Sequence, residues 1–435
     1  MDADAIIIGA GAAGLAAARQ LANRSFRTIV LEARDRVGGR VWSRSSAHGS
    51  AELGAEFIHG PAAETMALLR AAGMDAVPTG GEAWTCDAQG GLRRDEHETF
   101  LSAAGIFDGV ADLARDESVA HFLQRFAGDR SKQRIVEDAR AFVEGFDAAD
   151  PAIASARAIA AEWHSGVDSR SARPVGGYAP MFARLLHDCI TAGASIRLAN
   201  VVRRIAWRRG LVTVAVNAPS GEAQTLTARA AIVTLPAGVL RDPESVVFEP
   251  ELPSAKREAL AYIETGHVVR IALRFRAPFW ERVGNGRYRD AAFFRCAGLP
   301  FAAYWTQAPI RSNLIVAWAG GPKALELSGA GEPELVERAL AGFGALLGEP
   351  KLALDEFLEG AMHDWTRDPF ALGAYSYIAA GGDGARERLA ASLDGTLFFA
   401  GEAVAGGGQG GTVNGALQTG ERAAAQVAAA LETTV

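Results

Sequence analysis

The feature that most constrains this chain is a glycine-rich turn close to its first residue. An apolar run over residues 4–8 is typical of a buried strand, and it leads into Gly9-Ala10-Gly11-Ala12-Ala13-Gly14. A helix expected over residues 12–22 and a strand over 28–31 complete a βαβ unit. Closely spaced glycines allow a tight turn, and the amides that open the helix face a bound anion. The pattern predicts a dinucleotide-binding unit.

An acidic residue closes the second strand of this unit. Glu32 lies 23 positions after Gly9, where such units place the carboxylate that binds ribose hydroxyls. A carboxylate there disfavours a 2′-phosphate, so FAD or NAD is indicated over NADP. The chain continues to Gly38-Gly39-Arg40, which suits a second backbone approach and a charge-assisted contact to phosphate.

Length, composition and charge limit the number of domains and the kinds of partner that this chain can have. With 435 residues, of which 49% are hydrophobic and 22% charged, the chain exceeds one compact core and has material for two domains. The net charge of −7 argues against a nucleic-acid surface. We therefore expect no nucleic-acid partner. Every apolar stretch long enough to span a bilayer carries charges, so we also expect no membrane span.

The cysteines bear on the compartment. Cys86, Cys189 and Cys296 are an odd number in a long chain and do not resemble a disulfide framework. The apolar segment 5–18 has no basic region before it and is interrupted by glycines, unlike a signal peptide. We therefore expect a cytoplasmic protein with reduced thiols.

The order of predicted elements indicates an interleaved α/β fold. Residues 110–173 carry apolar residues at helical spacing, and strands are expected at 268–275 and 314–318. A strand at 396–400 and a helix at 412–431 then return to the first unit. We predict a Rossmann-like domain interleaved with an α+β substrate-binding domain that carries a helical insertion. The expected limits are 1–75, 176–265 and 385–435 for the first domain, and 76–175 and 266–384 for the second.

Several motifs spread over the chain together resemble the flavin-containing amine oxidase family, which includes monoamine, polyamine and L-amino acid oxidases. They are residues 9–14, Gly38-Gly39-Arg40, residues 53–60, Gly176-Gly177-Tyr178, Val233-Thr234-Leu235-Pro236, residues 365–375 and residues 399–416. The combination is far more specific than a lone glycine motif.

The resemblance implies that the Rossmann-like domain binds FAD, with Glu32 on ribose, Arg40 near phosphate, the Val202 backbone near adenine, and no metal. Covalent members have a cysteine where this chain has Ala374, so the FAD is expected to be non-covalent. The implied cofactor-binding residues are Gly9, Gly11, Ala13, Gly14, Glu32, Ala33, Arg34, Gly38, Gly39, Arg40, Gly54, Ala55, Glu56, Phe57, Val202, Trp365, Tyr375, Gly401, Glu402, Gly411, Thr412 and Val413.

The implied activity is oxidation of a primary or secondary amine, with polyamines among the candidate substrates. A neutral amine loses hydride from its α-carbon to flavin N5, the imine is hydrolysed, and O2 or another acceptor reoxidises the flavin, with H2O2 formed from O2. Tyr375 matches a position whose ring flanks the substrate amine. His59 matches a histidine near the substrate nitrogen in polyamine oxidases. A packed tyrosine and a structural histidine are the alternative interpretations.

Two departures from the family pattern keep other functions open. Arg270 stands where the family has a lysine near flavin N5, and arginine stays charged and prefers planar acceptors. Residues 406–411 lack the second aromatic wall, which leaves the site wider or lets another residue fill the place. The alternatives are an L-amino acid oxidase, a flavin-dependent desaturase or dehydrogenase, and a catalytically weak FAD-binding interaction module.

Overall fold

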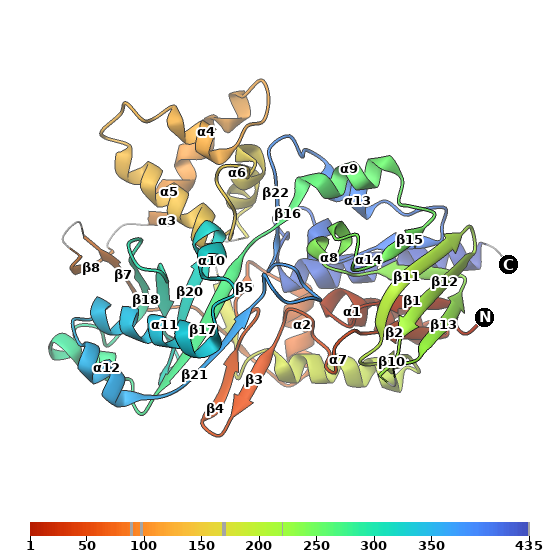
Figure 1. Ribbon diagram of the computed structural model, residues 1–435, viewed down its shortest axis with the longest axis horizontal. Helices are drawn as coiled ribbons and strands as arrows, with labels where there is room; N and C mark the ends of the chain where they lie inside the picture. Colours follow the sequence, from red (N-terminus) through yellow and green to blue (C-terminus); the bar gives the residue numbers. More distant parts are fainter. Residues whose placement is uncertain (88–89, 96–98, 168–170, 220, 434–435) are drawn as a thin grey trace.

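The computed structural model describes residues 1–435 except 88–89, 96–98, 168–170, 220 and 434–435. Figure 1 shows both chain ends on one side of the molecule, beside the first βαβ unit, and a larger sheet with a separate group of helices on the other side. The chain passes between the two sides several times. No helix within the described residues is long and apolar enough to cross a membrane.

A five-stranded parallel sheet forms the centre of the side that carries the chain ends. Its order is β10 (Ser195–Arg197), β2 (Thr28–Leu31), β1 (Ala5–Ile8), β14 (Ala230–Val233) and β23 (Leu397–Phe399). Every residue of β1, β2, β14 and β23 is buried, as expected for a parallel sheet covered on both faces. Because β1 lies between β2 and β14, the chain turns to opposite sides of β1, and ligands bind at such switch points.

Helices cover one face of this sheet. They are α1 (Ala12–Asn23), α2 (Ala63–Ala71), α7 (Ala179–Thr191) and α14 (Val413–Glu432). Their apolar residues share a core cluster with Ile7 and Val30 of the sheet. A Cβ at Gly420 would lie 2.2 Å from the Ala13 carbonyl oxygen, so glycine allows α14 to pack directly on α1.

A second sheet covers the opposite face. Its order is β13 (Ala223–Ala228), β12 (Leu211–Asn217), β11 (Val201–Arg208) and β15 (Val247–Glu249). Val212 and Val214 of β12 share a core cluster with Ile6 and Ile8 of β1. The same cluster takes residues from α8 (Ala237–Arg241), α9 (Ser254–Tyr262) and α13 (Ala385–Ala390). The central sheet is therefore the middle of three layers.

A seven-stranded mixed sheet forms the other side of the molecule. Its order is β21 (Phe357–Asp364), β17 (Val268–Phe275), β20 (Leu314–Gly320), β19 (Ala303–Trp305), β18 (Ala291–Arg295), β7 (Glu82–Cys86) and β8 (Leu92–Arg94). Its core includes residues of α10 (Gly321–Leu327), α11 (Glu332–Leu346), α12 (Pro350–Glu356), η2 (Phe279–Glu281) and η3 (Val283–Gly286).

The remaining elements connect or cap these sheets. The helical group contains α3 (Thr99–Gly105), η1 (Ile106–Asp112), α4 (Val119–Gln124), α5 (Gln133–Gly145) and α6 (Ala156–His164). Small sheets pair β3 (Ser43–Ser46) with β4 (Gly49–Glu52), β9 (Ser171–Pro174) with β5 (Ile58–His59) and β6 (Ala76–Pro78), and β16 (Ile263–Thr265) with β22 (Ser376–Ile378). The turn η4 (Glu402–Val404) precedes α14.

Most predicted elements are present at the expected places. The strand expected at 268–275 is β17, and the helix expected at 412–431 is α14. The insertion expected over 110–173 is helical as far as α6, and β9 then pairs with β5 and β6. The limits of the two domains remain a proposal.

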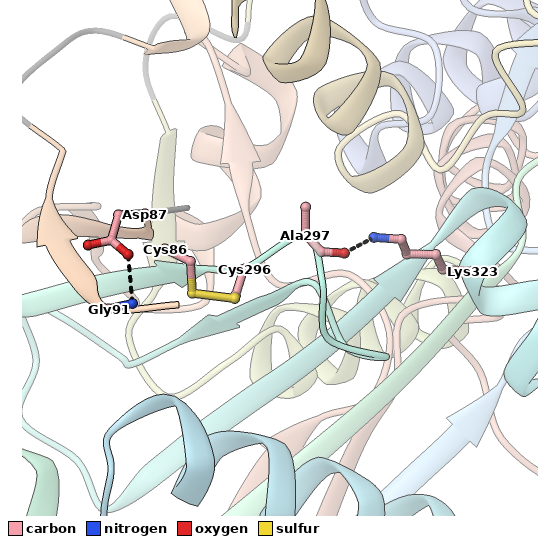
Figure 2. The surroundings of a disulfide bond; sticks show 6 residues. All are labelled: Cys86, Asp87, Gly91, Cys296, Ala297 and Lys323. Atoms are coloured by element: carbon pink, nitrogen blue, oxygen red, sulfur yellow. Dashed lines mark hydrogen bonds between the residues drawn. A yellow bond between two sulfur atoms is a disulfide. The ribbon is translucent and has the colours of Figure 1, made fainter. Parts of the chain in front are cut away.

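The expectation for the cysteines is wrong. Cys86 and Cys296 form a disulfide across a sequence separation of 210 (Figure 2). Cys86 ends β7 and Cys296 follows β18, and these strands are parallel neighbours in the seven-stranded sheet. An odd count could not show which two of three cysteines the sheet brings together. Cys189 is free and buried. The cytoplasmic location stays a proposal that the cysteines no longer support.

Candidate active site

The glycine turn follows β1 and leads into the start of α1. Gly9 has a φ of 105°, which L side chains rarely adopt, so the turn needs glycine there. A Cβ at Gly14 would lie 1.9 Å from the Gly9 carbonyl oxygen, so Gly14 allows α1 to pack against the turn. Gly11 is the N-cap of α1, and beyond its neighbours in the chain no heavy atom of the described residues lies within 4 Å of its Cβ position. The start of the helix is therefore open to an anionic ligand.

Glu32 lies at the end of the neighbouring strand β2, where it is 5% exposed. Its Oε2 accepts a hydrogen bond from the Ala10 amide at 2.7 Å, and its Oε1 accepts one from the Arg34 amide at 2.9 Å. Burial raises the pKa of Glu32, and these two hydrogen bonds oppose the rise. The carboxylate is thus held in a fixed orientation beside the glycine turn.

The Arg34 side chain is used within the protein. Its Nη2 pairs with Asp368 Oδ1 at 2.7 Å, and its guanidinium lies 5.3 Å from the centroid of the Phe370 ring. Burial raises the pKa of Asp368, but hydrogen bonds from His363 and Arg34 lower it overall to about 2. The Arg34 amide donates to Glu32 and its carbonyl accepts from the Ala199 amide, so a contact between Arg34 and the cofactor would use its remaining guanidinium nitrogens.

A second buried carboxylate, Glu402, connects Arg40 to the C-terminal loop. Its Oε1 accepts from Arg40 Nη1 at 2.8 Å, and its Oε2 accepts from Ser376 Oγ at 2.7 Å and from the Gly411 amide at 3.0 Å. Burial raises the pKa of Glu402, but Arg40 and Arg386 outweigh burial and hold it below its ordinary value. Contact between Arg40 and a phosphate would use its remaining nitrogens.

One cavity of about 1670 Å³ brings the predicted site together. Of the predicted residues only Gly14 does not line it, because Gly14 packs against Gly9. The volume exceeds the 300–1,000 Å³ common for small-molecule pockets, so a dinucleotide and a substrate fit together. The predicted residues that line it are Gly9, Gly11, Ala13, Glu32, Ala33, Arg34, Gly38, Gly39, Arg40, Gly54, Ala55, Glu56, Phe57, His59, Val202, Arg270, Trp365, Tyr375, Gly401, Glu402, Gly411, Thr412 and Val413.

Tyr375 forms part of the cavity wall between β21 and β22. Its hydroxyl donates to the Phe146 carbonyl, just beyond α5. The Cβ position of Gly411 lies 3.3 Å from Tyr375 Cδ2, so the ring lies against the glycine-rich loop. Ala374, the residue before it, is buried, and its carbonyl accepts from Arg40.

His59 ends β5 and lines the same cavity. The centroid of its ring lies 5.6 Å from that of Phe146 and 6.2 Å from that of Phe57. Burial lowers the pKa of His59 to about 4. The imidazole is therefore neutral at neutral pH and offers one donor and one acceptor.

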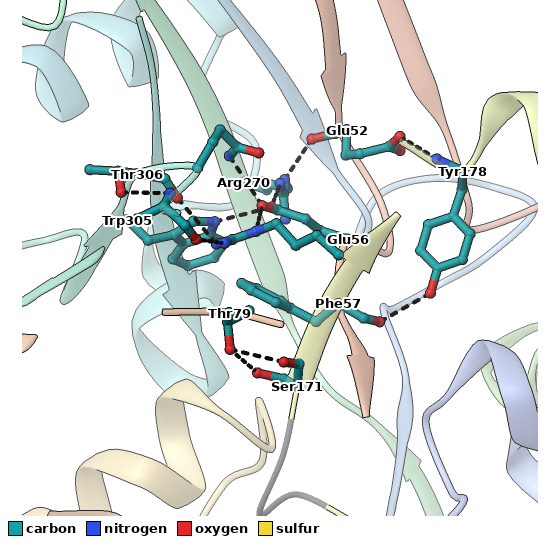
Figure 3. A network of polar contacts seen from close by, with 12 residues as sticks. Glu52, Glu56, Phe57, Thr79, Ser171, Tyr178, Arg270, Trp305 and Thr306 are labelled. Atoms are coloured by element: carbon teal, nitrogen blue, oxygen red, sulfur yellow. Dashed lines mark hydrogen bonds and ion pairs between the residues drawn. The ribbon is translucent and has the colours of Figure 1, made fainter. Parts of the chain in front are cut away.

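Arg270 is bound to a buried carboxylate, as Figure 3 shows. Its Nη2 donates to Glu56 Oε2, and its Nε donates to the Glu52 carbonyl at 2.7 Å. Glu56 also accepts from Arg173 Nε at 2.7 Å and from Trp305 Nε1 at 3.0 Å. Burial raises the pKa of Glu56, but Arg270 and Arg173 outweigh burial and lower it to about 2. The Arg270 guanidinium thus has two of its nitrogens committed to the protein.

Sequence reasoning missed the aromatic wall from the seven-stranded sheet. Trp305 of β19 and Trp318 of β20 both line the cavity, with ring centroids 5.6 Å apart. Phe293 of β18 extends the wall, 6.3 Å from Trp305. Each residue lies in an ordinary apolar strand without a local motif. Only strand pairing brings them together, so a single sequence carries no signal for this wall.

These features define a dinucleotide-binding protein with an adjoining aromatic chamber. A model of the family described as flavin containing amine oxidoreductase matches residues 12–428, and the chain belongs to that family. It is 28% identical over 465 residues to lysine-specific histone demethylase 1 homolog 2 of Oryza sativa subsp. japonica, covering 99% of this chain but 57% of that protein. It is 29% identical to polyamine oxidase 3 of the same plant, covering 97% of this chain and 88% of that protein.

Solved structures share the fold. Cyclohexylamine oxidase from Brevibacterium oxydans IH-35A superposes with a TM-score of 0.82 at 22% identity, covering 99% of this chain and all of that chain. A putrescine oxidase bound to putrescine gives a TM-score of 0.81 at 21% identity, covering 99% of both chains. The predicted fold class and family are confirmed, as is an FAD-dependent amine oxidoreductase. That the FAD is held without a covalent bond stays a prediction.

The residues present fit FAD. The open start of α1, the fixed Glu32 carboxylate and the cavity volume suit its pyrophosphate, ribose and ring system. Ala374 offers only a methyl group, which cannot form a thioether with the flavin. Among the residues with described positions, no group of three or more His, Cys, Asp or Glu is placed to hold a metal ion.

Proposed function

We propose that this chain oxidises a primary or secondary amine in the aromatic chamber, with O2 as the electron acceptor. The amine loses hydride from its α-carbon and a proton from its nitrogen and becomes an imine, which water hydrolyses to a carbonyl product and ammonia or an amine. The two electrons pass through the flavin to O2, which with the two hydrogens removed from the amine gives H2O2. The observation that carries the proposal is a single cavity that runs from the glycine turn to Tyr375, His59 and the tryptophan wall. The polyamine, putrescine and cyclohexylamine oxidases among its relatives support it.

The chain's own residues bind and orient the substrate. FAD, when bound, supplies the hydride acceptor. The rings of Tyr375, Trp305 and Trp318 exclude water and restrict the orientation of an apolar amine. His59 is neutral at working pH, so it can hydrogen bond to an uncharged amine without repelling a cation. A neutral amine is the form that can lose hydride, since its nitrogen lone pair becomes part of the new C=N bond.

An anaerobic substrate screen tests this function. The FAD-loaded protein is mixed with monoamines, diamines and L-amino acids, and bleaching of the flavin absorbance is followed before air is admitted. We expect amines to bleach the flavin, and air to restore it with formation of H2O2. Bleaching by L-amino acids alone would identify the amino acid oxidase alternative. A flavin that photoreduction bleaches but no amine does would identify the interaction module.

A further inference from the structure

Glu162 is a carboxylate in the cavity that the proposed reaction does not use. It lies on α6, beside Trp163, whose Nε1 donates to Asp147 Oδ2 at 3.0 Å and fixes this part of the helix. Glu162 lines the cavity. Over the described part of the chain, its carboxylate makes no side-chain hydrogen bond and no ion pair within 4 Å. A carboxylate withdrawn from bulk water without such a partner needs an explanation.

The glycine-rich loop places Glu162 on the same wall as Tyr375. The Cβ position of Gly410 lies 3.1 Å from Glu162 Oε1, and that of Gly411 lies 3.3 Å from Tyr375 Cδ2. Since adjacent Cα atoms are 3.8 Å apart, the carboxylate lies within about 13 Å of the Tyr375 ring. An extended polyamine chain can span this distance. The absence of an aromatic residue from this loop is what leaves Glu162 accessible to the chamber.

The cation that most affects Glu162 is already committed elsewhere. Arg386 Nη1 donates to Ser376 Oγ at 2.8 Å and to the Ala403 carbonyl at 3.1 Å, and Nη2 donates to the Ser376 carbonyl at 3.2 Å. Burial raises the pKa of Glu162, which Arg386 opposes and Glu402 reinforces. The wall therefore carries a carboxyl group that no described residue pairs with directly, and an ammonium group beside it would favour its ionised form.

We propose that Glu162 binds the second ammonium group of a diamine or polyamine whose reacting nitrogen lies at Tyr375. The inference rests on the proposed function and names its substrate class. A carboxylate and an ammonium group form charge-assisted hydrogen bonds, which are stronger in a partly desolvated cavity than at the surface. Arg270 does not compete for the same carboxylate, because it pairs with Glu56.

The test compares each diamine with the monoamine of equal chain length. Putrescine is paired with butylamine, and 1,8-diaminooctane with octylamine, in wild type and Glu162→Gln. We expect wild type to have a higher kcat/KM for the diamine whose length fits the distance from Tyr375 to Glu162 than for the monoamine of equal length. Glu162→Gln should lower kcat/KM for that diamine by about tenfold to a hundredfold, mainly through KM, and change the monoamine by less than about twofold. Glu258→Gln, a matched change of an exposed residue of α9 that does not line the cavity, should leave the ratio of diamine to monoamine kcat/KM unchanged for both chain lengths.

The outcomes separate the two proposals. If no amine reduces the flavin of the wild type, the proposed function fails. If monoamines and diamines are both oxidised, and wild type and Glu162→Gln show the same preference between them, the role of Glu162 is overturned while the function stands. If Glu162→Gln does not retain FAD, Glu162→Asp serves as the test, because it keeps the carboxylate on a side chain one methylene shorter. The proposal then requires a shifted preference among diamine lengths, and an unshifted preference overturns it.

Discussion

At the scale of single residues, the site depends on carboxylates that the chain itself holds in place. Glu32 accepts two backbone amides, and Glu402 accepts from Arg40 and from the loop that precedes α14. Glu56 accepts a hydrogen bond from Arg270 and holds its guanidinium in place. These side chains are oriented before any ligand arrives, so binding does not have to order them. Glu162 differs from all three because none of the described residues makes a hydrogen bond or ion pair with its carboxylate.

The pKa of His59 makes folding stability depend on pH. Its folded-state pKa of about 4 lies below the ordinary 6.5, so the unfolded chain takes up a proton that the folded chain refuses as pH falls through this range. Stability contributed by neutral His59 is complete above pH 6.5 and is lost toward pH 4. We expect the melting temperature of wild type to fall between pH 7 and pH 5. The melting temperature of His59→Gln should fall by less over the same interval. Thermal melts at both values check this, with exposed His48→Gln as the control.

Arg270→Lys tests the departure from the family pattern. Lysine can keep one bond to Glu56 but cannot also reach the Glu52 carbonyl in the arginine geometry. We expect FAD content to stay near that of wild type while the rate of flavin reoxidation by O2 changes severalfold, as stopped-flow mixing of reduced enzyme with O2 would measure. Arg274→Lys is the matched control, since Arg274 is buried on the same strand and does not line the cavity. Equal reoxidation rates in wild type and Arg270→Lys would make Arg270 a bystander.

At the scale of elements, the sequence predicted what depends on local pattern. The glycine turn at 9–14, the strand at 268–275 and the helix at 412–431 each have periodicity or a motif within a few residues. Contacts between residues far apart in the sequence have no such local pattern. Arg173 reaches Glu56 over 117 residues and Trp305 reaches it over 249, so neither could be inferred without the pairing of the strands.

The hydroxyl of Tyr375 links two elements. It donates to the Phe146 carbonyl and so joins the β21–β22 connection to the helical group. We expect Tyr375→Phe to slow flavin reduction modestly because the ring remains, and Tyr375→Ala to slow it by at least about tenfold because the substrate loses its wall. Both should retain FAD. Stopped-flow reduction and FAD content check this, with Tyr304→Phe as a buried control that does not line the cavity. Reduction of Tyr375→Ala at the wild-type rate would make Tyr375 a packing residue only.

At the scale of the whole molecule, the cavity is shared between distant parts of the chain. The parallel sheet supplies the glycine turn and Glu32, while the seven-stranded sheet supplies Arg270 and the tryptophan wall. Cys86 lines the cavity, and its disulfide with Cys296 joins β7 to the end of β18 (Figure 2). One covalent link therefore joins two strands of the sheet at the edge of the cavity.

The disulfide should make folding stability sensitive to reductant. A link that closes a loop of 210 residues restricts the unfolded chain, and the chain-entropy relation gives at most about 5 kcal/mol for such a loop. We expect the Cys86→Ser, Cys296→Ser double variant to melt at a lower temperature than wild type, and dithiothreitol to bring wild type down to the same midpoint. The reductant should not move the double variant, because the remaining Cys189 is a buried free thiol. If dithiothreitol exposes two further titratable thiols in wild type and the midpoint does not change, the link does not stabilise the fold.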